Sequence, residues 1–282
     1  MLTVNSLSGG KTSSYISANY PADIDVFALV CIDDHNAGRD LDKKLLQMAN
    51  DRLQKYSSHW PEFVATSEDP IILKTIFDLE QHIGREITWL RGMGWEQMIR
   101  TKKAIPNMDK RFCTTIMKII PIFQYLYLYH SLPVKMRIGY RWDEVERVDR
   151  FTDTIKYSTH CEYRPKSNTW IHRWKELIWR IGVFPLVDDH IIHYQIKQYW
   201  KDKNIQFPKD SNCLNCFWKD PQQLRKNFET NPPIMYWAAI QEELQGNTFK
   251  EKLSMLEIAE LGIQLDFNFG TGSGCQAGFC TD

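Results

Sequence analysis

The sequence has no long uninterrupted apolar run, no excess of charge of either sign, and no internal repeat or low-complexity tract. A helix that spans a bilayer needs roughly 20 consecutive apolar residues, so this absence argues against a membrane protein. Thirty-five Lys and Arg residues balance thirty-five Asp and Glu residues, which excludes a generally basic nucleic-acid coat but not a local basic cleft. The first residues lack the basic flank and apolar stretch of a signal peptide. We therefore expect a cytoplasmic protein with no membrane partner.

The length and the apolar content are those of a globular enzyme-sized chain. At 282 residues, 43% of them hydrophobic, it can form one large α/β domain or two smaller ones without disulfides. Residues 1–7 resemble a short buried strand, residues 11–20 can continue as a helix, and the apolar run 25–32 is typical of a strand buried on both faces. This strand–loop–helix–strand order predicts a βαβ unit and a parallel sheet with a right-handed crossover.

Further along the chain the pattern is rich in helices. Helices are expected at 41–56, 71–81, 88–102, 115–130, 170–179, about 190–202 and within 221–261, and a further strand at 134–140. We place a boundary near Asn204, with an α/β nucleotide-binding domain over 1–203 and a small helical, cysteine-bearing region over 204–282. The predicted fold class is α/β: a Rossmann-like parallel sheet flanked by helices.

A phosphate-binding loop is predicted between the first strand and the first helix. Its six residues are Ser8, Gly9, Gly10, Lys11, Thr12 and Ser13. Glycines let successive backbone N–H groups converge, the helix N-terminus adds a partial positive charge, and the hydroxyls and Lys11 complete an anion site. The spacing is not that of a Walker loop, and the plain alternative is a flexible turn with a Ser or Thr cap.

The loop and three later segments together resemble one family, the PP-loop ATP pyrophosphatases or adenine nucleotide alpha hydrolases. The match is to the branch similar to phosphoadenosine phosphosulfate (PAPS) reductase, whose signature begins with Ser-Gly-Gly-x-(Asp/Thr)-Ser. The later segments are RFCTTIMK (111–118), GYRWDEVER (139–147) and NCLNCFWK (212–219). They occur in the order typical of that branch.

The resemblance implies an adenine nucleotide, ATP or a PAPS-like compound, at the carboxyl ends of the strands. Asp33 and Asp34 lie where related folds bind adenine or ribose, and Gly139 belongs to the same segment as Arg141. The cations expected to neutralise an anionic substrate are Lys118, Arg141 and Arg147. Two acidic residues, Asp143 and Glu144, are expected either to hold Mg²⁺ or to orient the arginines.

Seven cysteines form the second candidate site. A cytosolic chain keeps thiols reduced, and the odd count with two close pairs favours metal or redox chemistry. Cys213 and Cys216 form a C-x-x-C pair, and Cys275 and Cys280 a C-x₄-C pair, a set that suits either Zn²⁺ or an iron–sulfur cluster. By analogy with adenylylsulfate reductases, we favour a [4Fe–4S] cluster held by Cys113, Cys213, Cys216 and one of Cys275 or Cys280. The alternative is that all four C-terminal cysteines bind zinc and Cys113 faces the nucleotide as a nucleophile.

The remaining candidates have ordinary interpretations. Cys31 is expected in the core, Cys161 in a surface loop, and His193 as an unremarkable helix residue. Trp170, Trp174 and Trp179 lie among basic residues, an arrangement that suits stacking and phosphate contacts with nucleic acid. The favoured interpretation there is an amphipathic helix that buries its tryptophans.

Three functions follow from these features. The first is an enzyme that adenylates a substrate or transfers sulfur, with catalytic Lys11, Cys113, Lys118 and Arg141 and a nucleic-acid base or small molecule as acceptor. The second is reduction of PAPS or adenylylsulfate to sulfite, although the tail (274–282) lacks that family's Glu-Cys-Gly-(Ile/Leu)-His segment. The third is a non-catalytic nucleotide- or cluster-binding protein. The sequence leaves open whether the chain forms a homo-oligomer.

Overall fold

A five-stranded parallel sheet forms the centre of the molecule. The computed structural model describes residues 1–209 and 213–262. The sheet has the order β5-β2-β1-β6-β9, and each neighbouring pair is parallel. Its strands are β1 (Thr3–Leu7), β2 (Ile24–Leu29), β5 (Ile87–Arg91), β6 (Val134–Arg137) and β9 (Arg180–Val183). The predicted α/β class with a parallel sheet is confirmed.

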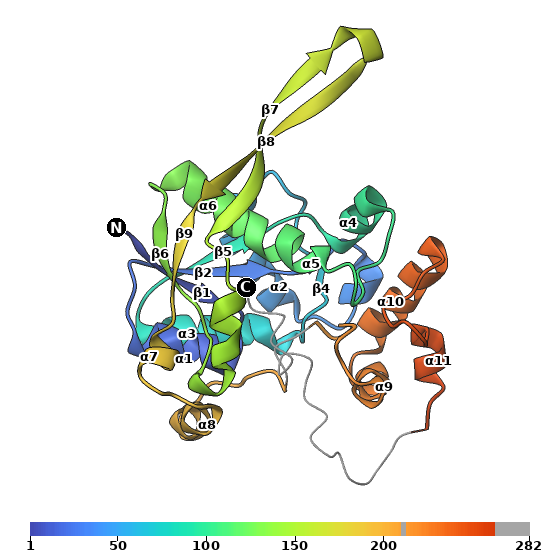
Figure 1. Ribbon diagram of the computed structural model, residues 1–282. Coiled ribbons are helices and arrows are strands. Elements are labelled where there is room, and N and C mark those ends of the chain that lie inside the picture. The colour runs from blue at the N-terminus through green and yellow to red at the C-terminus, as the bar shows by residue number, and fades with distance from the viewer. Residues whose placement is uncertain (210–212, 263–282) are drawn as a thin grey trace.

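Helices cover both faces of this sheet (Figure 1). Strand β2 divides its side chains between them, since successive residues of a strand point to opposite faces. Phe27 and Leu29 pack in one cluster with α1 (Lys11–Asn19), α2 (Lys43–Ser57) and α3 (Ile71–Ile83), whereas Val26 and Ala28 pack with α6 (Ile120–Tyr129). Burial on both faces explains why the sequence of β2 reads as a continuous apolar run.

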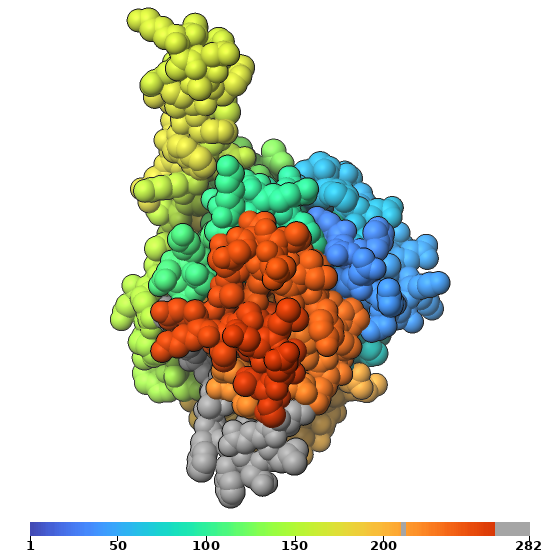
Figure 2. All heavy atoms as spheres, turned by 90° about the vertical axis from the view of Figure 1, so that its right-hand side faces the viewer, coloured from blue at the N-terminus to red at the C-terminus, as the bar shows by residue number. Residues whose placement is uncertain are grey.

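The C-terminal helices pack against the same body. They are α9 (Pro221–Thr230), α10 (Pro232–Gln245) and α11 (Met255–Ala259), and they gather on one side of the molecule (Figure 2). Their apolar residues share a hydrophobic cluster with α4 (Trp95–Lys102). Within it, the Trp95 and Trp237 rings lie 5.9 Å apart, and Trp237 Nε1 donates to Glu96 Oε1 at 2.8 Å.

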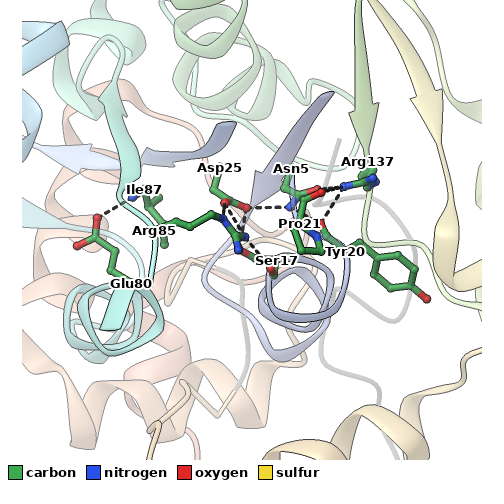
Figure 3. Close-up of polar contacts among 9 residues, drawn as sticks. All are labelled: Asn5, Ser17, Tyr20, Pro21, Asp25, Glu80, Arg85, Ile87 and Arg137. Atoms are coloured by element: carbon green, nitrogen blue, oxygen red, sulfur yellow. Dashed lines mark hydrogen bonds and ion pairs between the residues drawn. The ribbon is translucent and has the colours of Figure 1, made fainter. Parts of the chain in front are cut away.

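A polar network links β1 to its two neighbours at the level of Asn5 (Figure 3). Asn5 Nδ2 donates to Asp25 Oδ1 at 2.8 Å, between register partners on β1 and β2. The carboxylate of Asp25, 2% exposed, also pairs with Arg85 Nη2 at 2.9 Å. Arg137 of β6 donates to the Tyr20 carbonyl at 2.8 Å. Polar contacts of this kind specify the pairing of β1 with both neighbours beyond what apolar burial requires.

Two of the helix predictions are wrong. The segment 88–102 forms strand β5 and then α4, with Gly94 at the N-cap, because Ile87, Trp89 and Leu90 are buried in the sheet. The segment 170–179 belongs to strand β8 (Thr169–Ile178), which pairs antiparallel with β7 (Thr154–Arg164) in a hairpin. The backbone N–H and C=O groups of β8 form their hydrogen bonds with β7, so successive side chains of β8 point to opposite faces of the hairpin.

An amphipathic helix was expected to bury the tryptophans of this segment, but the hairpin exposes two of the three. Trp170 and Trp174 are 67% and 64% exposed, and only Trp179, just past β8, is buried. Cys161 lies on exposed strand β7 instead of in a loop, with its Sγ 3.2 Å from His172 Nδ1. The helix prediction failed because a basic, aromatic stretch fits an exposed ribbon as well as a helix face.

Shorter elements complete the chain. The predicted strand 25–32 divides after Leu29, and β3 (Cys31–Ile32) pairs antiparallel with β4 (Ala65–Thr66). The others are η1 (His35–Gly38), α5 (Phe112–Thr114), the π-helical turn η2 (Thr115–Ile119), η3 (Trp142–Arg150), η4 (Pro165–Ser167), α7 (Pro185–Asp188) and α8 (His193–Lys201). In the part of the chain that is described, no helix is both long and apolar enough to cross a membrane.

Candidate functional site

The strand order reverses between β1 and β6. From β1 the chain adds β2 and then β5 on one side, and afterwards crosses to place β6 on the other side of β1. In open α/β sheets, ligands bind outside the carboxyl ends of the strands at such a switch point. The loop 8–10 follows β1 and the segment 138–141 follows β6. The topology therefore places two of the predicted motifs at the expected ligand site.

The loop after β1 closes on itself before α1 begins. Gly9 has φ +73°, and a Cβ there would lie 2.3 Å from Ile72 Cγ1, so only glycine fits. Ser13 Oγ accepts from the Ser8 amide at 3.1 Å and donates to the Gly10 carbonyl at 3.2 Å. No side chain caps the N-terminus of α1, and its first turn contains no acidic residue. Its free amides and partial positive charge therefore suit an anion.

The segment after β6 packs directly on this loop. A Cβ at Gly139 would lie 3.4 Å from Thr12 Cγ2 and 3.6 Å from the Ser13 nitrogen, so the backbone of Gly139 lies one methyl group's van der Waals contact away from the start of α1. Arg141 Nη1 donates to Thr12 Oγ1 at 3.3 Å. The fold thus brings two motifs that are far apart in the sequence into side-chain contact.

Acidic residues orient the arginines of the second segment. Arg141 pairs with Asp143 Oδ1 at 2.9 Å and with Glu144 Oε1 at 3.0 Å. Arg147 pairs with the same Glu144 oxygen at 3.1 Å, and its guanidinium lies 4.1 Å from the centre of the Tyr140 ring. Glu144 and Arg147 are each 5% exposed. Within a turn whose other residues are mostly exposed, Glu144 and Arg147 therefore form a buried ion pair that holds the Arg141 side chain in place.

His193, interpreted from the sequence as ordinary, belongs to this site. It begins α8, which packs on α1, where Trp200 Nε1 donates to the Lys11 carbonyl at 2.9 Å. Burial, and then the charges of Arg141, Lys197 and Lys11, lower the pKa of His193 from its usual 6.5. Its buried Nδ1 has no hydrogen-bond partner among the described residues. No sequence signal identifies it, because helix packing alone brings it near these cations.

The two predicted ribose or adenine ligands have different partners. Asp33 Oδ1 accepts from Arg91 Nη2 at 2.8 Å, and its side chain is 27% exposed. A Cβ at Gly94 would lie 2.0 Å from Asp33 Oδ2, so the carboxylate occupies space that only glycine leaves. Asp34 caps η1 by accepting from the Asn36 amide at 2.9 Å. Of the two, Asp33 is held beside a buried cation and Asp34 has a local structural contact.

Lys118 lies beside the cysteines. Its Nζ pairs with Glu68 Oε1 at 2.9 Å, and Glu68 is 1% exposed. Cys113 and Cys213 both pack against the cluster formed by the C-terminal helices. Burial, followed by the charge of Glu68, raises the pKa of Cys213 to about 12, and burial also raises the pKa of Cys113.

The described cysteines form only part of the predicted metal set. The Cys216 amide donates to the Cys213 carbonyl at 3.1 Å, which closes a tight turn over the C-x-x-C pair. Cys275 and Cys280 lie outside the described residues. Across residues 1–209 and 213–262, no three His, Cys, Asp or Glu side chains are grouped so that they could hold a metal. The structure brings Cys113 near Cys213.

Comparisons with protein-family models, curated proteins and solved structures found no match to this chain.

Proposed function

We propose that the crevice between the loops after β1 and β6 binds an adenine nucleotide, and that the protein is a PP-loop enzyme of the PAPS reductase-like type. The contact between Thr12 and Arg141, with Gly139 packed on the loop, carries this proposal. It joins a phosphate-binding turn to a bidentate cation at the topological switch point.

The residues around the crevice favour phosphate groups. The uncapped amides of α1 and the Lys11 side chain are expected to hold the terminal phosphates, and Arg141 bridges the two loops. The pKa of His193 is lowered first by burial and then by the charges of Arg141, Lys197 and Lys11, so several cations act on this crevice. An anionic ligand is stabilised there because its charge offsets the repulsion among the cations.

The proposed reaction is transfer of the adenylyl group of ATP. A substrate oxygen attacks the α-phosphorus, the bond from that phosphorus to the bridging oxygen breaks, and pyrophosphate leaves. Loop amides and Lys11 would stabilise the negative charge that develops on the leaving pyrophosphate. Asp143, whose side chain is 41% exposed, is the better carboxylate for Mg²⁺, since Glu144 is shared by two arginines.

The cysteine region is the second part of the proposal. Cys113, Cys213, Cys216 and one of the tail cysteines Cys275 and Cys280 would hold a [4Fe–4S] cluster, whereas Zn²⁺ would be held by Cys213, Cys216, Cys275 and Cys280. Thiolates are the ligands that both require. A cluster would supply sulfur or redox chemistry, whereas zinc would stabilise the region.

Equilibrium binding of ATP to the full chain tests the nucleotide site. Arg141→Ala should weaken ATP binding about ten-fold or more, because a charge-assisted contact contributes roughly 1.5–3 kcal/mol. Lys135→Ala, at the exposed amino-terminal end of β6, is the matched control and should bind as the native chain does. Failure of the native chain to bind either ATP or PAPS would overturn the proposal.

Product analysis separates the two chemistries. Pyrophosphate release from ATP supports adenylation. Release of sulfite from PAPS in the presence of a dithiol reductant would instead assign the crevice to sulfonucleotide reduction. Nucleotide binding without either product would leave a binding protein and contradict the catalytic part of the proposal.

A further inference from the structure

The β7–β8 hairpin stands away from the body of the protein (Figures 1 and 2). Only its root contributes to the core, through Ile155. From residue 159 to residue 176 every side chain is exposed except Ile171, which is half-buried. A ribbon this exposed buries too little apolar surface to stabilise the fold. Its surface chemistry is therefore the property to explain.

One face of the hairpin carries a row of aromatic rings. Trp170, His172 and Trp174 are alternate residues of β8, so they point to the same side. Tyr163 is the register partner of Trp170, and their rings lie 5.2 Å apart. The rings of His172 and Trp174 lie 5.9 Å apart. Exposed tryptophans gathered in this way indicate a binding surface.

The hairpin is also basic, although the whole chain has no net charge. Between residues 154 and 178 there are five Lys and Arg residues and two Glu residues. Glu162 is paired with Arg173, and Glu176 accepts from Thr154. The side chains of Arg164, Lys166 and Lys175 are exposed and have no hydrogen-bond or ion-pair partner within the described residues. The unpaired charge on this projecting element is thus positive.

We propose that the hairpin binds a single-stranded nucleic acid, with bases stacked on the aromatic row and phosphates paired with the unpartnered cations. Alternate residues of a strand lie about 6.8 Å apart, which corresponds to two nucleotide steps of about 3.4 Å. Aromatic rings interleaved with basic residues are the usual means by which proteins hold single strands. A second copy of this chain fits less well, because charged side chains on ribbon edges oppose strand pairing.

A second group of aromatic residues lies at the root of the hairpin, on the face opposite Trp174, since Tyr157 is the register partner of Lys175. Tyr157 of β7 lines a cavity of about 320 Å³ together with Tyr125 and Tyr127 of α6. The Tyr127 and Tyr157 rings lie 6.2 Å apart. A strand bound along the aromatic row would have to pass around the edge of the ribbon to reach this cavity. This inference is independent of the nucleotide site after β1.

Fluorescence anisotropy with a labelled 20-nucleotide oligothymidine tests the proposal on the full chain. The variant Trp170→Ala with Trp174→Ala should bind at least ten-fold more weakly, because stacking contributes about 1–3 kcal/mol per base. Tyr236→Ala, an exposed aromatic on α10 (52% exposed), is the control and should bind as the native chain does. Lys166→Glu with Lys175→Glu should reduce the dependence of log affinity on log salt by about two.

Two further measurements can contradict the proposal: binding of a duplex of the same length, and the oligomeric state of the protein. Thermal unfolding of each variant should match the native chain, since these side chains are exposed. Equal binding by the tryptophan variant, or tighter binding of the duplex than of the single strand, would overturn stacking. Absence of binding at low salt would overturn the proposal, as would a dimer that the tryptophan variant dissociates in sedimentation.

Discussion

The Arg141 guanidinium donates to the Thr12 hydroxyl at 3.3 Å, although 129 residues separate them in the chain. Thr12 lies in the first turn of α1 and Arg141 lies just past β6. Because β1 and β6 are neighbours only through a crossover, the contact exists only when the central sheet is complete. The same contact positions the arginine over the loop that we propose holds phosphates.

The pH dependence of nucleotide binding should reveal His193. In the free protein its pKa lies below 6.5, so the imidazole is neutral at pH 7. A bound phosphate would raise that pKa, since negative charge favours the imidazolium. Binding then takes up a proton between the two pKa values, and affinity should rise as pH falls through this window.

Calorimetry in buffers of different ionisation enthalpy measures that proton uptake. His193→Gln should abolish the His193 contribution and leave only the titration of the nucleotide itself. An unchanged proton count in the variant would contradict the placement of His193 beside the phosphates.

Gly9 should be far less replaceable than Gly84. Both have positive φ, +73° and +64°, but a Cβ at Gly84 meets nothing within 4 Å whereas one at Gly9 meets buried Ile72. Gly84→Ala should cost about 1 kcal/mol of unfolding free energy from backbone strain, and Gly9→Ala about 2–4 kcal/mol with overpacking added. Denaturant unfolding measures both.

A double variant separates the two contributions at Gly9. Combining Gly9→Ala with Ile72→Ala should destabilise the protein by less than the sum of the single changes. The Ile72→Ala change removes the atoms that the new Cβ would clash with, and the new Cβ partly fills the cavity that Ile72→Ala leaves. Simple additivity would show that the clash with Ile72 is not the cause.

The stability that the Asp25 network contributes should depend on Arg85, the cation that pairs with the Asp25 carboxylate. Arg85→Ala leaves a carboxylate that is 2% exposed with only Asn5 and Ser17 as partners. Removing one partner of a fully buried ion pair costs about 3–5 kcal/mol of unfolding free energy. We expect a smaller loss for Arg85→Ala, about 2–3 kcal/mol, because the Arg85 side chain is 30% exposed and solvent screens its charge. Asp25→Asn with Arg85→Met should be milder than Arg85→Ala. If the double variant unfolds more easily in urea, the uncompensated charge is not what destabilises Arg85→Ala.

Metal content will decide the nature of the cysteine region. After anaerobic purification, about four iron and four sulfide per chain would support the cluster, and about one zinc without sulfide would support a structural site. Cys213→Ala should lose either metal, and exposed Cys161→Ala should retain it. Native protein with neither metal would contradict both assignments.

Strands β1, β2 and β6 and the loop after β1 were predictable because local signals agree with the tertiary structure there. The apolar run of β2 reports burial on both faces, and two glycines before a helix report a tight turn. Segments 88–102 and 170–179 were predicted wrongly because strand pairing overrides local helical character. In segment 88–102, Trp89 is buried in the sheet. In segment 170–179, the backbone forms its hydrogen bonds with the neighbouring exposed strand β7.

The sequence by itself determined the α/β class, the position of the glycine loop and the candidate cysteines, since each depends on residue types at short spacing. Tertiary structure alone decided that Gly139 and Arg141 meet Thr12, that His193 joins them, and that Trp170 and Trp174 point into solvent. The physical reason is that these relations arise from crossover connections and from packing between distant elements. Neither leaves a periodic pattern in the chain.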